Sequence, residues 1–169
     1  MTEKEIKRGF WDYDPTNNYP PKFIDHPCQY NGETLLAFRI NKQTEETTLQ
    51  NKKRVELWCS TLPKLNKVKY LWTFWTNQKV FDAICEMPDL EGLHIAWGGG
   101  VTNIDSLSKL RQIKHLHLEG FTKVENIEVL GTLDTIETLE LEHFKKISDF
   151  SVLSKLTQLI GLGLDGSID

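Results

Sequence analysis

The second half of the chain carries a hydrophobic pattern that returns at a nearly constant interval. Three positions, almost all apolar and spaced as L-x-x-L-x-L, occur five times, and their first members lie 22, 23, 23 and 23 residues apart. A period of about 20–29 residues is typical of a solenoid, in which each repeat buries its apolar side against its neighbours. The triplets are Val68/Leu71/Thr73, Leu90/Leu93/Ile95, Ile113/Leu116/Leu118, Ile136/Leu139/Leu141 and Leu159/Leu162/Leu164.

The spacing within each repeat predicts which parts are strands. Each triplet ends in strand-like alternation, so we predict parallel strands near residues 69–73, 92–96, 115–119, 138–142 and 161–165. Apolar residues then recur at every third position, which favours 3₁₀ turns or a short irregular helix on the back of the array. The first repeat differs, because residues 77–87 have helical spacing and are followed by Pro88.

This pattern resembles the leucine-rich-repeat family, and in particular its short bacterial, internalin-like branch. The segment from Ile147 to Leu159 is similar to the back-side consensus of that branch. The resemblance implies an α/β solenoid with a parallel concave sheet, an irregular or 3₁₀ back side, and a role in binding proteins. The family usually places Asn or Cys three residues after the last strand leucine, but this chain has Gly98, Phe121 and Phe144 there. We therefore predict that the rings of Phe121 and Phe144 are buried and in contact.

The first 62 residues lack the repeat, and we interpret them as an N-terminal capping segment in front of about five repeats in residues 63–169. Residues 1–30 combine aromatic residues with prolines, which favours an ordered loop. Residues 35–40 and 55–59 are predicted as short strands. The polar stretch between them, residues 41–54, fits either the arms of a hairpin or an exposed loop.

Composition and motifs exclude several functional classes. The net charge of −4 disfavours a general nucleic-acid binder, which is normally basic. Neither a membrane-spanning run nor a secretory signal is visible, and the three widely spaced cysteines fit a reduced cytoplasmic protein. The motifs of serine hydrolases, P-loop proteins and zinc proteases are missing, so we expect neither catalysis nor a cofactor.

Alternation along the predicted strands assigns one set of side chains to the concave face. Aromatic rings lie at the N-terminal end of this face, histidines in the middle and carboxylates beyond. Grouped exposed aromatic residues are typical of protein interfaces, although the capping segment could instead cover Tyr70 and Trp72. The predicted partner-binding residues are Tyr70, Trp72, Trp75, His94, Trp97, His115, His117, Glu119, Glu140 and Glu142.

Three further hypotheses are open. His94, His115 and His117 could form a metal-binding or metal-regulated site with Glu119 or Glu140 as a carboxylate ligand. The protein could also be an immunity-type inhibitor of a toxin or enzyme. Finally, the last predicted strand has no following back-side turn, so its edge could form a homodimer, or the chain could be part of a longer array.

Overall fold

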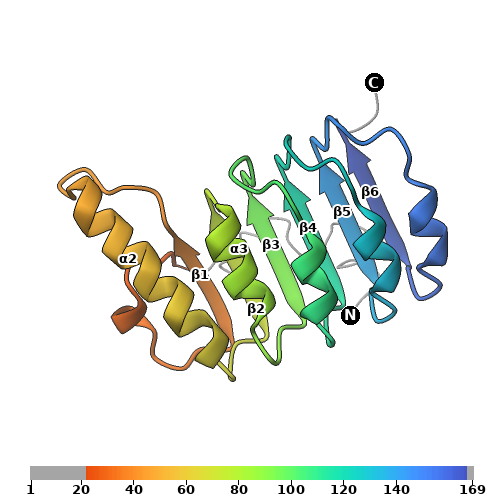
Figure 1. The fold of residues 1–169 in the computed structure, drawn as a ribbon. Coiled ribbons are helices and arrows are strands. Elements are labelled where there is room, and N and C mark those ends of the chain that lie inside the picture. Colours follow the sequence, from red (N-terminus) through yellow and green to blue (C-terminus); the bar gives the residue numbers. More distant parts are fainter. Residues whose placement is uncertain (1–21, 167–169) are drawn as a thin grey trace.

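A computed structural model describes residues 22–166, and its main feature is one parallel sheet. Six strands lie in this sheet in sequence order, and every neighbouring pair is parallel (Figure 1). The five strands predicted for the repeats are confirmed, and the first of these, β2, lies one residue later than expected. The strands are β1 (Leu35–Arg39), β2 (Tyr70–Phe74), β3 (Gly92–Ala96), β4 (His115–Glu119), β5 (Thr138–Glu142) and β6 (Gly161–Asp165).

The helices lie together on one face of the sheet (Figure 1). Two are α-helices, α2 (Thr48–Thr61) and α3 (Gln78–Cys85). The helix expected at residues 77–87 is α3, with the Asn77 side chain as its N-terminal cap. The later repeats carry 3₁₀ helices, which confirms the expected back side. These are η3 (Asp105–Lys109), η4 (Glu128–Thr132) and η5 (Ser151–Lys155), while η1 (Pro27–Gln29) and η2 (Leu62–Lys64) lie nearer the N-terminus.

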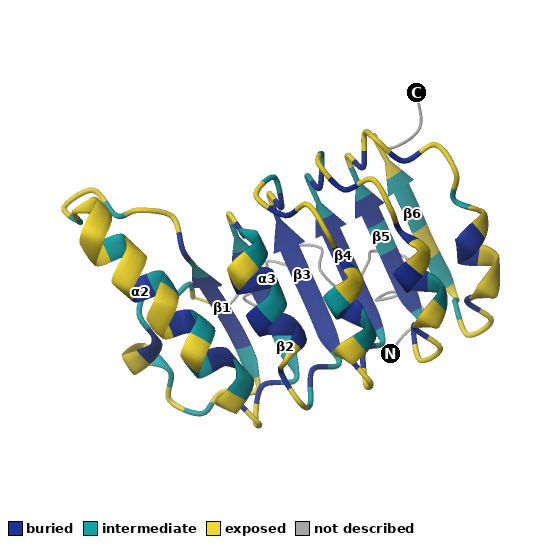
Figure 2. Cartoon of the chain, viewed as in Figure 1, coloured by how far each residue is buried: buried dark blue, intermediate teal, exposed yellow. Residues whose placement is uncertain are grey.

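Parallel pairing stacks equivalent leucines of successive repeats into columns. Leu71, Leu93, Leu116 and Leu139 are partners in the ladder, and all four are buried. The central strands are therefore buried along most of their length, whereas the outer surfaces of the helices are exposed (Figure 2). Each repeat thus buries its apolar residues only by lying next to another repeat.

The N-terminal segment corrects one prediction. Residues 55–59 do not form a strand, because they belong to α2, and residues 48–54 form the first half of the same helix. Thr47 and Gln50 start the helix with a reciprocal capping box, the Thr47 side chain accepting from Gln50 N–H and the Gln50 side chain from Thr47 N–H. The expected strand at residues 35–40 is confirmed as β1. Because β1 pairs in parallel with β2, this segment extends the sheet of the repeats.

A buried arginine connects α2 to the segment around it. The guanidinium of Arg54 donates to both carboxylate oxygens of Glu46, at 2.9 Å each. It also donates to the backbone carbonyls of Asp25, Arg39 and Asn41. The ion pair lowers the pKa of Glu46 to about 2, with the Arg54 hydrogen bonds as the largest cause. The charge on α2 is therefore matched inside the protein rather than left unpaired.

Aromatic rings fill the turns where the family pattern has an amide side chain. Phe121 and Phe144 are fully buried, and their rings stack with centroids 5.4 Å apart and planes 2° apart. The prediction of a buried pair is confirmed. Gly98 occupies the equivalent position in the preceding repeat, where a Cβ would lie 2.3 Å from the Phe121 ring. The Phe121 ring therefore occupies the space that a side chain at position 98 would need.

Truncation of either ring should leave a cavity in this core. We expect Phe121→Ala or Phe144→Ala to lower the free energy of unfolding by about 3–5 kcal/mol, the usual cost for a core phenylalanine. Urea denaturation followed by circular dichroism measures this change. A loss below about 1 kcal/mol would contradict the packing described for these rings.

The strand β6 forms one edge of the sheet. Among the described strands it pairs with β5 alone, and Ile160 and Leu162 are more than half exposed. Self-association through this edge stays a prediction, which light scattering over a range of concentrations tests. A strict monomer at high concentration would rule out the homodimer.

None of the helices within residues 22–166 combines the length and the apolar character that crossing a membrane requires.

Candidate functional site

The face of the sheet opposite the helices carries a row of stacked rings, which we call the ring row: Phe74, Trp72, His94 and His117. Strand register places Trp72 beside His94 and His94 beside His117. The ring centroids of Trp72 and His94 lie 4.9 Å apart, those of His94 and His117 lie 4.0 Å apart, and both pairs have planes within 7°. Phe23 packs edge-on against Trp72 and Phe74 at the start of the row. The row is thus packed rather than open, since Trp72, His94 and His117 are all buried.

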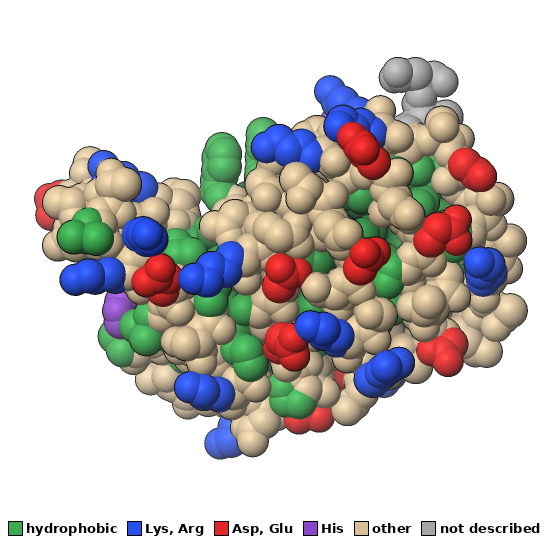
Figure 3. Space-filling view, in the orientation of Figure 1, with side chains coloured by type: hydrophobic (Ala, Val, Ile, Leu, Met, Phe, Trp, Pro, Cys, Tyr) green, Lys and Arg blue, Asp and Glu red, His purple; other side chains and the backbone are tan. Residues whose placement is uncertain are grey.

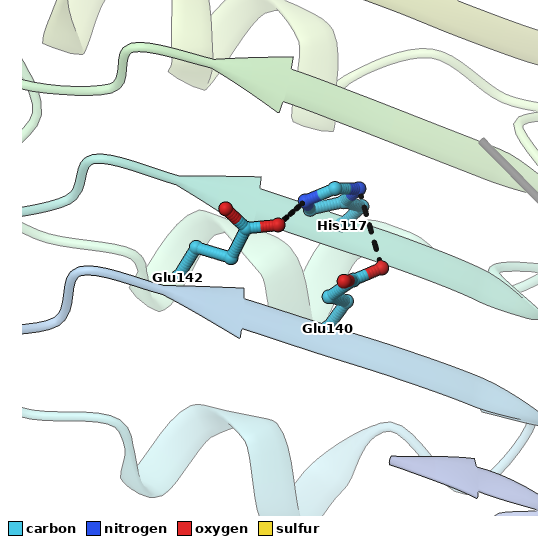
Figure 4. A group of neighbouring side chains, drawn as sticks. All are labelled: His117, Glu140 and Glu142. Carbon is cyan, nitrogen blue, oxygen red and sulfur yellow. Dashed lines mark hydrogen bonds and ion pairs between the residues drawn. The ribbon is translucent and has the colours of Figure 1, made fainter. Parts of the chain in front are cut away.

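Two carboxylates contact the last ring of the row (Figure 4). The Nε2 atom of His117 lies 2.8 Å from a Glu142 oxygen, and its Nδ1 atom lies 3.5 Å from a Glu140 oxygen. Each ring nitrogen therefore faces its own carboxylate, which suits an imidazolium because both of its nitrogens donate. The repulsion between the two carboxylates is offset when that ring carries a proton.

The orientations of the three histidine rings can be compared with what a shared metal ion would require. A metal binds an imidazole lone pair in the plane of the ring, and the stacked rings of His94 and His117 direct their lone pairs along parallel planes. His115 turns its Nδ1 to the Thr138 hydroxyl, 2.9 Å away. Within residues 22–166, the candidate group whose ligand atoms come together is His117, Glu140 and Glu142, all within 4.8 Å. Its two carboxylates lie nearest to different ring nitrogens of His117, and metal binding by this group stays a prediction.

Burial shifts the pKa values of groups on this face. The pKa of His94 lies well below its ordinary value because the ring is desolvated and because His117 is adjacent. Desolvation also lowers the pKa of His115. The pKa of Glu119 is raised, first by burial and then by the negative charge of Glu142. The face therefore favours neutral His94 and His115, and it makes the negative charge on Glu119 costly.

A second feature lies just past the strand ends, where one residue of each repeat has a left-handed backbone. We call these five residues the left-handed column. Glycine adopts this conformation without strain, but for other residues it costs roughly 1–2 kcal/mol. Three of the five carry a side chain, and a bulky residue with positive φ is an outlier that warrants a functional hypothesis. The column consists of Trp75 (φ 60°), Trp97 (φ 65°), Gly120 (φ 75°), His143 (φ 58°) and Gly166 (φ 56°).

The next repeat holds three of these five residues in place through their backbone. The backbone N–H of Trp75, Gly120 and His143 donates to the carbonyl of the residue that ends the following strand, at 2.9–3.1 Å. The indoles of Trp75 and Trp97 stack with centroids 5.4 Å apart and planes 13° apart. They remain 54% and 53% exposed. Hydrophobic side chains accordingly project from the edge of the molecule where the strands end, beyond α3 and β3 (Figure 3).

A groove of about 560 Å³ runs along the same edge, and we call it the edge groove. The left-handed column and the turn residues that follow it supply most of its lining, and Glu119 at the end of β4 supplies the rest. The groove combines exposed indole surface with a few polar and charged groups, which is typical of a binding site. It is lined by Trp75, Thr76, Asn77, Trp97, Gly99, Gly100, Glu119, Gly120, Thr122, His143 and Lys145.

The structure divides the residues that the sequence assigned to one binding face. Trp75, Trp97 and Glu119 line the edge groove. Tyr70, Glu140 and Glu142 are half-buried on the sheet. The buried members are Trp72, His94, His115 and His117.

Sequence reasoning missed the groove itself and the contribution of Asn77, Thr122, His143 and Lys145 to its lining. A signal was available, because Gly120 and Gly166 recur at the position that also holds Trp75, Trp97 and His143. Repeated glycine at one place in a turn indicates a positive φ.

Comparison with known proteins bears on the fold. No protein-family model matches the chain, and no curated protein matches it in sequence. A crystal structure of an internalin from Listeria monocytogenes is similar, with a TM-score of 0.54 and 22% identity over 77% of this chain. The fold is a leucine-rich-repeat fold similar to that of an internalin. This chain spans about a third of the internalin chain, since the match covers 34% of it. At 22% identity, this similarity shows the fold alone.

The pKa shifts predict how stability depends on pH. A histidine with a lowered pKa binds fewer protons when folded than when unfolded, so stability falls as pH drops below the ordinary histidine value of about 6.5. His94 and His115 both act in this direction. Glu119, with its raised pKa, acts in the opposite direction. His94→Phe keeps a ring in the row but removes the titrating group. We expect this variant to lose a pH dependence of the free energy of unfolding of at most about 1.4 kcal/mol per pH unit.

Urea denaturation of both proteins at pH 7, 6 and 5 measures this dependence. The difference between the two stability curves isolates His94, because the variant keeps the other titrating groups. Parallel curves over this range would contradict the lowered pKa of His94.

Proposed function

We propose that the protein is a non-catalytic binding module that docks a protein partner through the edge groove. The observation that carries the proposal is the exposure of two stacked tryptophans at positions where the backbone is strained. Trp75 and Trp97 expose about half of their surface, although a glycine would relieve the backbone strain at either position. Exposed aromatic pairs of this kind are typical anchors of protein interfaces. The internalin-like fold also supports a role in protein interaction.

The residues predicted from the sequence take different roles in this proposal. Trp75, Trp97 and Glu119 contact the partner inside the groove, and Tyr70, Glu140 and Glu142 form the adjoining part of the surface. The buried side chains of Trp72, His94, His115 and His117 pack beside this surface on the same face of the sheet. Affinity comes from desolvation of the indoles, and the carboxylates favour a partner with basic groups.

The test compares a groove variant with a matched control. Trp75→Asn/Trp97→Asn removes both indoles, and asparagine tolerates a left-handed backbone better than alanine does. The control, Leu49→Asn/Leu57→Asn, removes two apolar side chains of α2 that are 63% and 41% exposed. All three proteins should unfold within about 1 kcal/mol of one another, as is usual for surface substitutions.

Quantitative pull-down from the native host is the readout. We expect a partner that is retained by the wild type and by the α2 variant and lost, by at least tenfold, from the groove variant. A partner retained equally by all three proteins would contradict docking through the groove. Inhibition of that partner's activity by the wild type alone would identify the protein as an immunity-type inhibitor. Its cytoplasmic location stays a prediction.

A further inference from the structure

Glu119 is a carboxylate of the edge groove, and it has no ion-pair partner among residues 22–166. Glu119 ends β4 and pairs in register with Glu142 of β5, which in turn pairs with Asp165 of β6. Neighbouring strands are about 4.8 Å apart, so this register brings like charges together at the strand ends. Glu142 accepts a hydrogen bond from His117, which partly compensates it. The Glu119 carboxylate makes neither a hydrogen bond nor an ion pair with any residue from 22 to 166.

The surroundings of Glu119 make its negative charge costly. Burial and the charge of Glu142 both raise its pKa, and the opposing effect of His143 is smaller. A cation placed beside this carboxylate would relieve the repulsion and replace the lost hydration. The position is therefore one where a bound positive group is electrostatically favoured.

The indole of Trp97 lies in the same groove and fits the same kind of group. It stacks on Trp75, toward β2, whereas Gly120 comes next in the column on the β4 side. A Cβ at Gly120 would lie 3.3 Å from the Trp97 Cα, so any larger residue would begin against Trp97. Gly120 therefore adds no side chain to the part of the groove that Trp97 and Glu119 also line.

A guanidinium suits this space better than an ammonium. It is planar, it stacks on an indole face, and it binds a carboxylate through two parallel hydrogen bonds. The groove contains two other ionisable side chains, His143 and Lys145. Lys145 repels either kind of cation, so the preference for a guanidinium rests on its stacking against the indole and its two hydrogen bonds to the carboxylate.

We propose that the edge groove binds an arginine side chain of the partner, with its guanidinium paired to Glu119 and stacked against Trp97. This inference rests on the proposed function and adds the chemistry of the anchoring side chain. It also assigns a role to Gly120, which adds no side chain to the groove where that guanidinium would lie.

The probe for this proposal is the blocked tripeptide acetyl-Gly-Arg-Gly-amide, titrated into protein with ¹⁵N-labelled tryptophan. The chain has five tryptophans, and Trp75→Phe and Trp97→Phe assign the relevant indole N–H signals. We expect the peptide to shift the signals of Trp75 and Trp97 and not that of the buried Trp58. The same peptide with citrulline, a neutral isostere of arginine, should bind at least threefold more weakly.

Two variants separate the carboxylate from general charge effects. Glu119→Gln should weaken binding of the arginine peptide by at least threefold and abolish its preference over the citrulline peptide. Glu128→Gln, on the helical face, should leave both unchanged. Equal shifts with the two peptides, unchanged binding to Glu119→Gln, or shifts confined to other tryptophans would each overturn the proposal.

The arginine proposal can fail while the proposed function stands, and the pull-down distinguishes the two cases. A partner lost from Trp75→Asn/Trp97→Asn in the pull-down but retained by Glu119→Gln would refute the arginine anchor and leave docking through the groove intact. A partner lost from both variants would support both proposals.

Discussion

Parallel, in-register stacking of the strands is the constraint on which the rest of this structure depends. Equivalent residues lie 22 or 23 positions apart, so each place in the repeat becomes a column that runs across the sheet. The arrangement is favourable for Leu93 and Leu116, which bury each other, and for the stacked rings of Phe121 and Phe144. It is unfavourable for Glu119 and Glu142, which become neighbours for the same reason. Both the stable core and the charged end of the groove thus follow from one geometric rule.

The repeated part of the chain was predictable because its local signals agree with its tertiary contacts. The leucine spacing identified the strands, and the every-third spacing identified the 3₁₀ helices. The N-terminal part was harder. The side of α2 that faces inward contains Arg54 and Trp58, and a charged residue at a buried position interrupts the apolar period that marks a helix. Only the tertiary partner Glu46, and the carbonyls around it, make that arginine acceptable inside the protein.

The candidate site was predictable in composition but not in arrangement. Alternation along the strands correctly placed Trp72, His94 and His117 in one row. It could not show that these side chains are buried, because alternation assigns a face without saying what packs against it. It also treated Trp75 and Trp97 as additions to that face, whereas a left-handed backbone directs them to the edge groove. Backbone conformation at a turn depends on hydrogen bonds to the next repeat, which hydropathy does not report.

The left-handed column has a consequence for how this protein can change over generations. The tryptophan codon UGG becomes the glycine codon GGG through a single base change, so a relaxed backbone at position 75 or 97 is one mutational step away. Such a change would remove an exposed apolar ring and its backbone strain together. Selection for stability alone would accept it. Sequences of related chains that keep an aromatic residue at these two positions would therefore record selection for contact with another molecule.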